Sequence, residues 1–293
     1  MKTSVLRDQT FNRRFLDDGY VVVPFLDTAA VAQVLEGFER LRPERLEPLH
    51  RAQLHNDVEY RKGVHRLIRD AFDPRMEILM NEYRAVIATF IVKEPQEVRS
   101  ELPMHADTSF VDESKFMSAN IWCPLVDTTR KNGCLRVIPG SEHHFFPIRV
   151  FSCRQGVVNH PFNDVMPLMK NYIEEIEVPA GHAVVYNARL IHGSGPNMSG
   201  TRRVAVVCVN TPKEAPIHAA VPASSAAEAE VFEIPDPSFF WTHQIDEPPV
   251  GAKSLGTTMY QQSQLTKADV LKSPYLRRRR SSWSDWRRLI PFG

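Results

Sequence analysis

Two histidines and one aspartate have the side-chain types and the spacing to share a metal ion. His105 and Asp107 are separated by one residue, and His192 follows Asp107 by 85 residues. Residues i and i+2 of an extended segment point to the same face, so His105 and Asp107 can reach one ion while Ala106 faces away. Two imidazoles and one carboxylate that leave three positions open form the facial triad of non-haem Fe(II) oxygenases. Taken alone, however, His-x-Asp is a common spacing, and a solvated pair near the end of a strand explains it without any metal.

A pair of arginines follows the second histidine and supplies a candidate anion site. Arg202 and Arg203 come at the end of a turn-rich segment and open a β-patterned run over residues 204–209. An arginine inside the mouth of an apolar barrel needs a carboxylate partner, because an unpaired buried guanidinium is strongly disfavoured. A carboxylate of a ligand could be that partner. Both faces of residues 204–210 are apolar, so the alternation of the strand does not distinguish Arg203 from Arg202.

Short β-rich segments surround these residues. Turn signals such as Lys-Asn-Gly, Pro-Gly-Ser and Pro-Ala-Gly separate the segments. Strands without helices between them indicate an antiparallel barrel or sandwich, because a parallel pair needs a crossover connection. The central half of the chain is therefore predicted to be all-β, with strands within residues 118–126, 134–138, 173–178, 182–187 and 203–210.

Helices are expected on the N-terminal side of this β region. A β-branched run at residues 19–26 predicts a strand, and the apolar spacing that follows predicts a helix with Asp27 or Thr28 as its N-cap. A second helix is predicted over residues 76–91, because most of its apolar side chains fall on one stripe. Both helices are expected to brace the β region.

The C-terminal part of the chain has a different composition. After Thr211 it is rich in Pro, Ala, Ser and Glu, and residues 219–229 are predicted to form a surface loop or a flexible flap. Residues 277–288 combine six arginines with two tryptophans. That cluster could touch phosphate or a membrane surface, and a solvated terminus is the simpler interpretation.

Composition excludes several classes of partner. The 293 residues carry a formal net charge of +1, so no overall field recruits nucleic acid, and a small molecule is the expected partner. Charged residues near the N-terminus and a longest apolar run of eight residues argue against a signal peptide and against insertion into a membrane. The four widely spaced cysteines predict a reducing, cytoplasmic location. The oligomeric state cannot be read from the sequence.

Several segments resemble the phytanoyl-CoA dioxygenase family of Fe(II)- and 2-oxoglutarate-dependent oxygenases. The similarity starts at residues 15–22, includes Trp122 and continues through residues 132–143, which read Asn-Gly-Cys-Leu-Arg-Val-Ile-Pro-Gly-Ser-Glu-His. It ends near Thr211, after His192 and its arginines. The resemblance implies a mainly β, double-stranded β-helix fold braced by N-terminal helices. A single domain over residues 1–293 is expected, with its core at about 100–211, helical support in 1–99 and an extension in 212–293.

The resemblance also implies a role for each candidate residue. His105, Asp107 and His192 would bind iron and carry the catalysis. Arg203, eleven residues after the second histidine, would grip the distal carboxylate of 2-oxoglutarate. Ser194 and Trp122 would line that site, although Trp122 is also consistent with a simple core aromatic. The implied cofactors are Fe(II), 2-oxoglutarate as co-substrate and O₂.

The implied reaction is oxidation, most directly hydroxylation, of an unactivated C–H bond in a small molecule of secondary metabolism. Related halogenases have a small residue where this chain has Asp107, so halogenation is not expected. Two alternatives remain open, namely a metal-binding protein of the same fold without turnover and a zinc hydrolase. This chain lacks the His-Glu-x-x-His motif that a zinc hydrolase would be expected to carry. Other histidines are interpreted as surface, turn or core residues, and an arginine-rich region at residues 51–69 as a solvated face or a contact for an anionic substrate.

Overall fold

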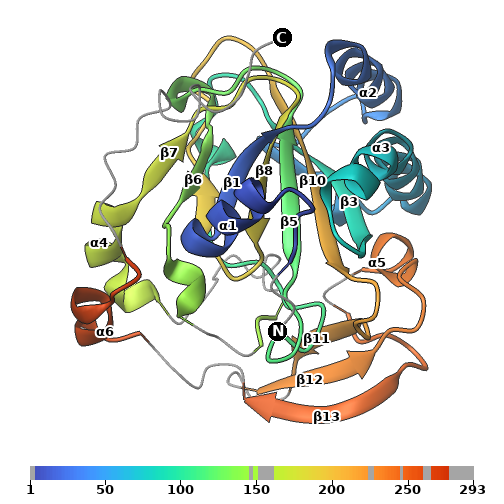
Figure 1. Cartoon of the computed structure of the whole chain (residues 1–293). Coiled ribbons are helices and arrows are strands. Elements are labelled where there is room, and N and C mark those ends of the chain that lie inside the picture. Colours follow the sequence, from blue (N-terminus) through green and yellow to red (C-terminus); the bar gives the residue numbers. More distant parts are fainter. Residues whose placement is uncertain are drawn as a thin grey trace.

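Two antiparallel sheets form the centre of the molecule (Figure 1). The computed structural model describes residues 4–144, 148–150, 162–223, 228–244, 247–259 and 265–276. The six-stranded sheet contains, in spatial order, β1 (Tyr20–Pro24), β8 (His182–Asn187), β5 (Ala119–Pro124), β10 (Arg203–Pro212), β3 (Tyr83–Lys93) and β2 (Leu49–Arg51). The four-stranded sheet contains β4 (Leu102–His105), β9 (His192–Ser194), β6 (Leu135–Val137) and β7 (Glu174–Ile176). The predicted mainly β fold is confirmed, and each of the segments predicted as strands in the central region contains one.

The longest strand pair lies in the six-stranded sheet. β10 and β3 pair from Arg203 opposite Lys93 to Pro212 opposite Tyr83, with a bulge at Val209 and Asn210. Nearly every residue of both strands is buried, because helices cover one face of the sheet and the interior of the barrel covers the other. β-Branched residues suit a strand that is buried on both faces.

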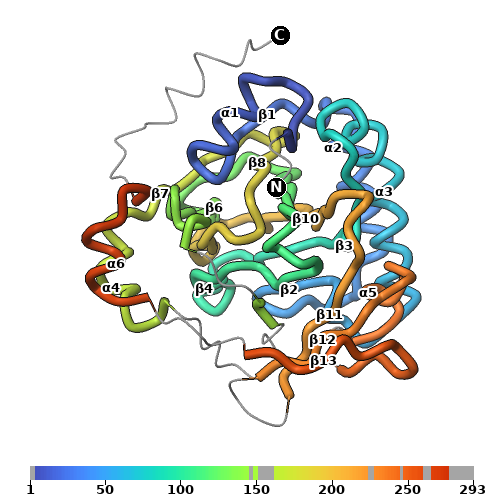
Figure 2. Tube along the Cα trace, turned by 60° about the horizontal axis from the view of Figure 1, so that its bottom comes forward, coloured from blue at the N-terminus to red at the C-terminus, as the bar shows by residue number. Residues whose placement is uncertain are grey.

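Helices cover the outer face of the six-stranded sheet. Both views place α2 (Thr28–Leu41) and α3 (Val58–Leu79) beside β3, while α1 (Gln9–Asp18) lies over β1 and β8 (Figures 1 and 2). The side chain of Asp27, one of the two predicted N-caps, accepts a hydrogen bond from the N–H of Ala30 at 2.9 Å and caps α2. Phe38 on α2 packs edge-on against Phe90 on β3, with ring centroids 5.0 Å apart.

The predicted helix at residues 76–91 is wrong. α3 ends at Leu79, and residues from Tyr83 onward form the central strand β3. Glu82, with a φ angle of 57°, turns the chain between the two elements. A strand buried on both faces is continuously apolar, so its residues also fill a helical stripe, and the spacing of apolar positions cannot separate the two cases.

The prediction of a loop or flap at residues 219–229 is also wrong for the residues that the structure describes there. A three-stranded sheet consists of β11 (His218–Pro222), β12 (Glu228–Glu233) and β13 (Lys253–Met259). Ala219, Ala220 and Val221 are buried, and side chains from β11 and β12 pack with Phe110 and Phe240. The small apolar residues of this segment are ordered because side chains from other parts of the chain cover them.

Three short α-helices lie outside the N-terminal region. α5 (Phe239–Thr242) packs against α3, whereas α4 (Met166–Met169) and α6 (Lys267–Lys272) pack together on the side of the four-stranded sheet (Figure 2). None of the helices in the described part of the chain combines the length and the apolar character of a transmembrane span. The predicted basic-aromatic cluster at residues 277–288 lies outside the described residues.

Candidate metal centre

The two histidines face each other across a strand pair. His105 ends β4 and is the register partner of His192, which begins β9. The centroids of their two rings are 4.3 Å apart. Nδ1 of His105 lies 2.8 Å from the carbonyl oxygen of Pro103, and Nδ1 of His192 lies 2.9 Å from that of Leu190. Because a carbonyl oxygen can only accept, each Nδ1 carries the proton, and each Nε2 keeps a lone pair for a metal ion.

Asp107 completes the group just beyond the end of β4. Its Oδ1 lies 3.6 Å from Nε2 of His105 and 3.6 Å from Nε2 of His192. The main-chain N–H of Asp107 donates to the carbonyl of Ala188, which ties this segment to the chain that leads into β9. Potential ligand atoms of the three residues all lie within 4.8 Å of one another, so the donor set suits a divalent transition metal.

The protonation states also suit metal binding. Burial lowers the pKa of His192 to about 4, so its imidazole is neutral near pH 7. Burial alone would raise the pKa of Asp107, but the neighbouring imidazoles of His192 and His105 and a hydrogen bond from Tyr186 outweigh it and hold this pKa well below the ordinary value. The site therefore offers a carboxylate and a neutral imidazole without any prior loss of a proton.

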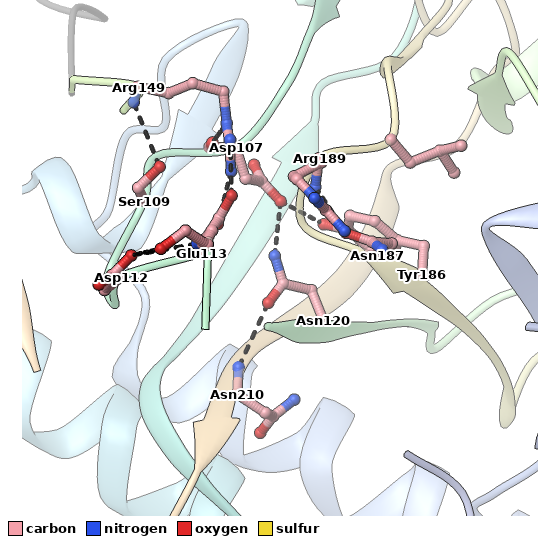
Figure 3. A network of polar contacts seen from close by, with 12 residues as sticks. Asp107, Ser109, Asp112, Glu113, Asn120, Arg149, Tyr186, Asn187, Arg189 and Asn210 are labelled. Atoms are coloured by element: carbon pink, nitrogen blue, oxygen red, sulfur yellow. Dashed lines mark hydrogen bonds and ion pairs between the residues drawn. The ribbon is translucent and has the colours of Figure 1, made fainter. Parts of the chain in front are cut away.

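Three hydrogen bonds, from Asn120, Tyr186 and Arg149, hold Asp107 in place (Figure 3). Its Oδ2 accepts hydrogen bonds from Asn120 Nδ2 at 2.6 Å and from the hydroxyl of Tyr186 at 2.9 Å. On the main-chain side, Nε of Arg149 donates to the Asp107 carbonyl oxygen, and the rest of its guanidinium makes two 2.7 Å contacts with the buried carboxylate of Glu113. Asp107 is thus fixed through both its backbone and its side chain.

Arg203 is a buried cation with unused hydrogen-bond donors. Its side chain is fully buried, and Nη1 donates to the carbonyl oxygen of Ile91 at 3.2 Å. Nε and Nη2 have no partner among the described residues. Burial lowers the pKa of Arg203 to about 9, so the guanidinium still carries its charge near pH 7. Since buried donors without partners are costly, this arrangement favours an anionic ligand.

Arg202 has the opposite surroundings. Its guanidinium pairs with Glu94 at 2.6 Å and with Glu39 at 3.3 Å on the outside of the barrel. The alternation of β10 thus points Arg202 outward and Arg203 inward, a choice that the apolar pattern of both strand faces left open.

A buried lysine lies next to Arg203. Lys93 is its register partner on β3, and the amino group of Lys93 donates to the carbonyl oxygens of Ser100, Ser194 and Gly195. Burial, followed by the charge of Arg203, lowers the pKa of Lys93 to about 6. Near pH 7 the amine of Lys93 is therefore largely uncharged, and the positive potential that an anion would meet here comes from Arg203.

Ser194 and Trp122 are buried on strands of the two different central sheets. Ser194 is buried on β9, two residues after His192. Trp122 is buried on β5, the neighbour of β10 in the sheet, and its ring lies 5.7 Å from the guanidinium carbon of Arg203. Trp122 thus lies near the guanidinium of Arg203, and the carbonyl oxygen of Ser194 contacts Lys93, the register partner of Arg203.

The other histidines that the structure describes, and the arginine-rich segment, do not join this centre. His50 hydrogen-bonds the hydroxyl of Tyr60, and His65 stacks on Trp241 with ring centroids 3.7 Å apart. Arg61 is neither on a solvated face nor available to a substrate, because its buried guanidinium donates to carbonyl oxygens of His55, Trp241 and Thr242. Within the described part of the chain, the metal-ligand geometry is met by one group, which consists of His105, Asp107 and His192.

Sequence reasoning missed several residues that shape this site. Asn120 is an amide inside an otherwise apolar strand, and Lys93 is a basic residue at the end of another. A buried polar residue in such a run needs a partner, so these two positions carried a usable signal. Arg149 and Glu113 gave no such signal, because they lie 36 residues apart in segments without a recognisable helix or strand pattern.

One solved structure with the same fold is HygX from Streptomyces hygroscopicus with nickel and 2-oxoglutarate bound. It is 15% identical in sequence, and the match covers 71% of this chain and 88% of HygX, with a TM-score of 0.50. At this identity the comparison supports the fold alone.

Similar sequences occur in plants and in Dictyostelium discoideum. Phytanoyl-CoA dioxygenase 1 from rice is 31% identical over 124 residues, which make up 42% of this chain and 43% of the rice protein. Phytanoyl-CoA dioxygenase from Arabidopsis thaliana is 32% identical over 118 residues, or 40% of each protein. A Dictyostelium homolog of phytanoyl-CoA dioxygenase domain-containing protein 1 is 22% identical over 198 residues, which make up 67% of this chain. The chain thus spans about two fifths of the length of the plant relatives.

The sequence model of the family described as phytanoyl-CoA dioxygenase (PhyH) matches residues 15–205. That match covers more than half of the 293 residues and includes all three candidate metal ligands and Arg203. The chain therefore belongs to the phytanoyl-CoA dioxygenase family.

Proposed function

We propose that this chain is an Fe(II)- and 2-oxoglutarate-dependent dioxygenase that oxidises a C–H bond of a small molecule. The observation that carries the proposal is a two-His, one-carboxylate cluster close to a buried guanidinium with two unused donors. Lys93 lies between the metal cluster and the guanidinium. It stands opposite Arg203 in the pairing of β3 with β10, and its amine contacts the carbonyl of Ser194, two residues after His192. A ligand with a chelating end and a distal carboxylate satisfies both parts of this site.

The residues divide the work between holding the metal and orienting the co-substrate. Nε2 of His105, Nε2 of His192 and Oδ1 of Asp107 would hold Fe(II). Arg203 would donate from Nε and Nη2 to the distal carboxylate of 2-oxoglutarate. When bound, Fe(II) with 2-oxoglutarate supplies O₂ activation and substrate oxidation, with release of succinate and CO₂. The residues proposed for the co-substrate site are Arg203, Ser194 and Trp122.

Burial is the protein's other contribution to the chemistry. Arg203 and His192 are nearly inaccessible to solvent. The guanidinium and the carboxylate of a bound co-substrate would therefore meet in a medium of low dielectric constant. A fixed guanidinium orients the co-substrate before reaction and removes much of the entropic cost of alignment.

The finer proposal is hydroxylation. Asp107 supplies an anionic ligand at a position that a halogenating site would need to leave open for halide.

We infer a small organic molecule of secondary metabolism as the substrate and a cytoplasmic location. The location is supported by Cys123, Cys134 and Cys208, which are buried free thiols, as expected in a reducing compartment.

Anaerobic titration tests the proposal. Purified apo-protein is titrated with Fe(II) and then with 2-oxoglutarate, and the visible charge-transfer band of the chelate is followed in wild type and in His192→Ala. We expect the band in the wild type alone. Tight zinc binding without such a band, together with hydrolytic turnover, would replace the oxygenase with a zinc enzyme of the same fold.

A further inference from the structure

The two oxygens of the Asp107 carboxylate have different surroundings. Oδ1 lies 3.6 Å from Nε2 of both histidines, whereas Oδ2 accepts hydrogen bonds from the protein. Two hydrogen-bond donors converge on Oδ2, namely Asn120 Nδ2 at 2.6 Å and the Tyr186 hydroxyl at 2.9 Å (Figure 3). One oxygen is therefore occupied by the protein and the other is directed toward the metal ligands.

The two donors belong to one cross-strand pair. Asn120 on β5 is the register partner of Tyr186 on β8, so both side chains leave the sheet on the same face. Both residues are almost completely buried. The six-stranded sheet thus presents two donors side by side toward a carboxylate that is carried by the other sheet's β4 segment.

A third strand orients the Asn120 amide. The main-chain N–H of Asn210 on β10 donates to Asn120 Oδ1 at 3.3 Å (Figure 3). Because that oxygen already faces a donor, the NH₂ group must face Asp107. Tyr186 is held in turn by packing, with its ring centroid 4.6 Å from that of His192.

An aspartate can bind a metal through one oxygen or through both. Bidentate binding here would use a coordination position that a chelating co-substrate and O₂ require. Two donors on Oδ2 stabilise its negative charge where it lies and oppose its rotation toward the ion. Hydrogen bonds to a metal ligand from residues outside the coordination sphere commonly change metal affinity by about 10–100-fold.

We propose that Asn120 and Tyr186 are positioning residues that hold Asp107 as a one-oxygen ligand and keep three coordination positions open. This role rests on the proposed Fe(II) and 2-oxoglutarate chemistry of the same site. This role explains why two polar side chains lie in the middle of a buried sheet, where apolar residues would otherwise pack.

Tyr186→Phe is the sharpest test, because it removes one hydroxyl and keeps the ring. Tyr20→Phe is a matched control: Tyr20 is the register partner of Tyr186 on β1, is equally buried, and donates to a carboxylate, Glu174 Oε2, at 2.8 Å. Apo-protein is titrated anaerobically with Co(II), whose visible absorption depends on coordination number and geometry. We expect about tenfold weaker binding and an altered spectrum in Tyr186→Phe, and wild-type behaviour in Tyr20→Phe.

Asn120→Ala tests the second donor independently and keeps the proposal testable if Tyr186→Phe is poorly folded. We expect the same direction of change, and a double variant about 100-fold weaker in Co(II) affinity. Wild-type affinity and spectrum in both single variants, with thermal unfolding unchanged, would overturn the positioning role.

Adding 2-oxoglutarate to the Co(II) protein separates this role from the proposed function. If the wild type binds Co(II) but its spectrum does not respond to 2-oxoglutarate, the oxygenase proposal fails. Weaker Co(II) binding by Tyr186→Phe in that same experiment would still support the hydrogen bonds as determinants of the metal site.

Discussion

Arg202 and Arg203 are neighbours in sequence with different energetic situations. Arg202 makes ion pairs at the surface, where each pair contributes roughly 0–1 kcal/mol. Arg203 is fully buried with two donors unused, so it destabilises the fold unless an anion joins it. A residue that weakens the empty protein and strengthens the complex is characteristic of a binding site.

Replacing these two arginines in turn gives a matched comparison. Arg203→Met removes two charge-assisted hydrogen bonds, each contributing about 1.5–3 kcal/mol, so the dissociation constant for 2-oxoglutarate should rise about 100-fold or more. Arg202→Met should leave it within about threefold of wild type. Both values follow from anaerobic titration of the Co(II) protein. An equal loss of 2-oxoglutarate affinity in the two variants would contradict the assignment, as would a comparable loss of Co(II) affinity in Arg203→Met.

At the scale of elements, β3 determines where the buried basic side chains lie. It carries Lys93, pairs with β10 so that Lys93 stands opposite Arg203, and supports α2 and α3 on its outer face. A helix over residues 76–91 would have separated these groups. Phe90 fills the space between β3 and α2, where it meets the ring of Phe38.

A double-mutant cycle on Phe38 and Phe90 measures this packing. Each change to Ala should lower the free energy of unfolding by about 3–5 kcal/mol, because both side chains are fully buried. The two rings should show a coupling of about 0.5–1.5 kcal/mol in denaturant titrations. Ile78→Ala serves as the control: Ile78 is 73% exposed on α3 and should change stability by less than about 0.5 kcal/mol. Strict additivity would show that α2 does not dock on β3 as described.

Arg61 joins the N-terminal helices to the C-terminal part of the molecule. It reaches from α3 to two carbonyl oxygens of α5, Trp241 and Thr242, next to the three-stranded sheet. Arg61→Met should therefore speed amide hydrogen exchange in α5 and in β11 and β12, because buried carbonyls lose their donors. Arg66→Met, at an exposed position of the same helix, should leave exchange unchanged. Uniformly faster exchange across both large sheets would instead indicate global destabilisation.

For the whole molecule, Glu142 makes stability depend on pH. Its carboxylate lies against Gly19, whose φ angle of 78° and lack of a Cβ permit the contact. Burial raises the pKa of Glu142 from 4.5 to about 7. Because the folded protein keeps this proton to a higher pH than the unfolded chain, the stabilisation is present in full below about pH 4.5 and is lost as the pH rises through about 7.

Glu142→Gln should remove this dependence. The contribution amounts to roughly 3 kcal/mol of unfolding free energy between pH 4.5 and 8. Urea unfolding at several pH values should give a flatter profile for Glu142→Gln than for wild type. Glu36→Gln, at an exposed position on α2, should keep the wild-type slope. An unchanged slope in Glu142→Gln would show that Glu142 is already charged at pH 5 in the folded protein.

Spacing alone supplied candidates for the metal site, although it fitted a solvated His-x-Asp pair as well, and the family resemblance singled out these residues as ligands. The metal-ligand candidates His105, Asp107 and His192, the strands around them and the cap at Asp27 follow from local patterns, because a strand alternates its faces and a helix begins where a side chain can accept its first N–H groups. Family resemblance added Arg203 and the co-substrate, since an arginine at that position has no local signature.

Contacts between segments that are distant in sequence decided which arginine faces inward, which apolar run is a strand and which side chains hold Asp107. The choice of Arg203 as the inward arginine depends on which face of β10 meets the barrel interior, and the apolar run of β3 became a strand because β10 and β2 pair with it. Asn120 and Tyr186 meet Asp107 through strands that are 13 and 79 residues away in sequence. Local propensity extends over a few residues, whereas burial and hydrogen-bond partners are set by chain segments that only folding brings together.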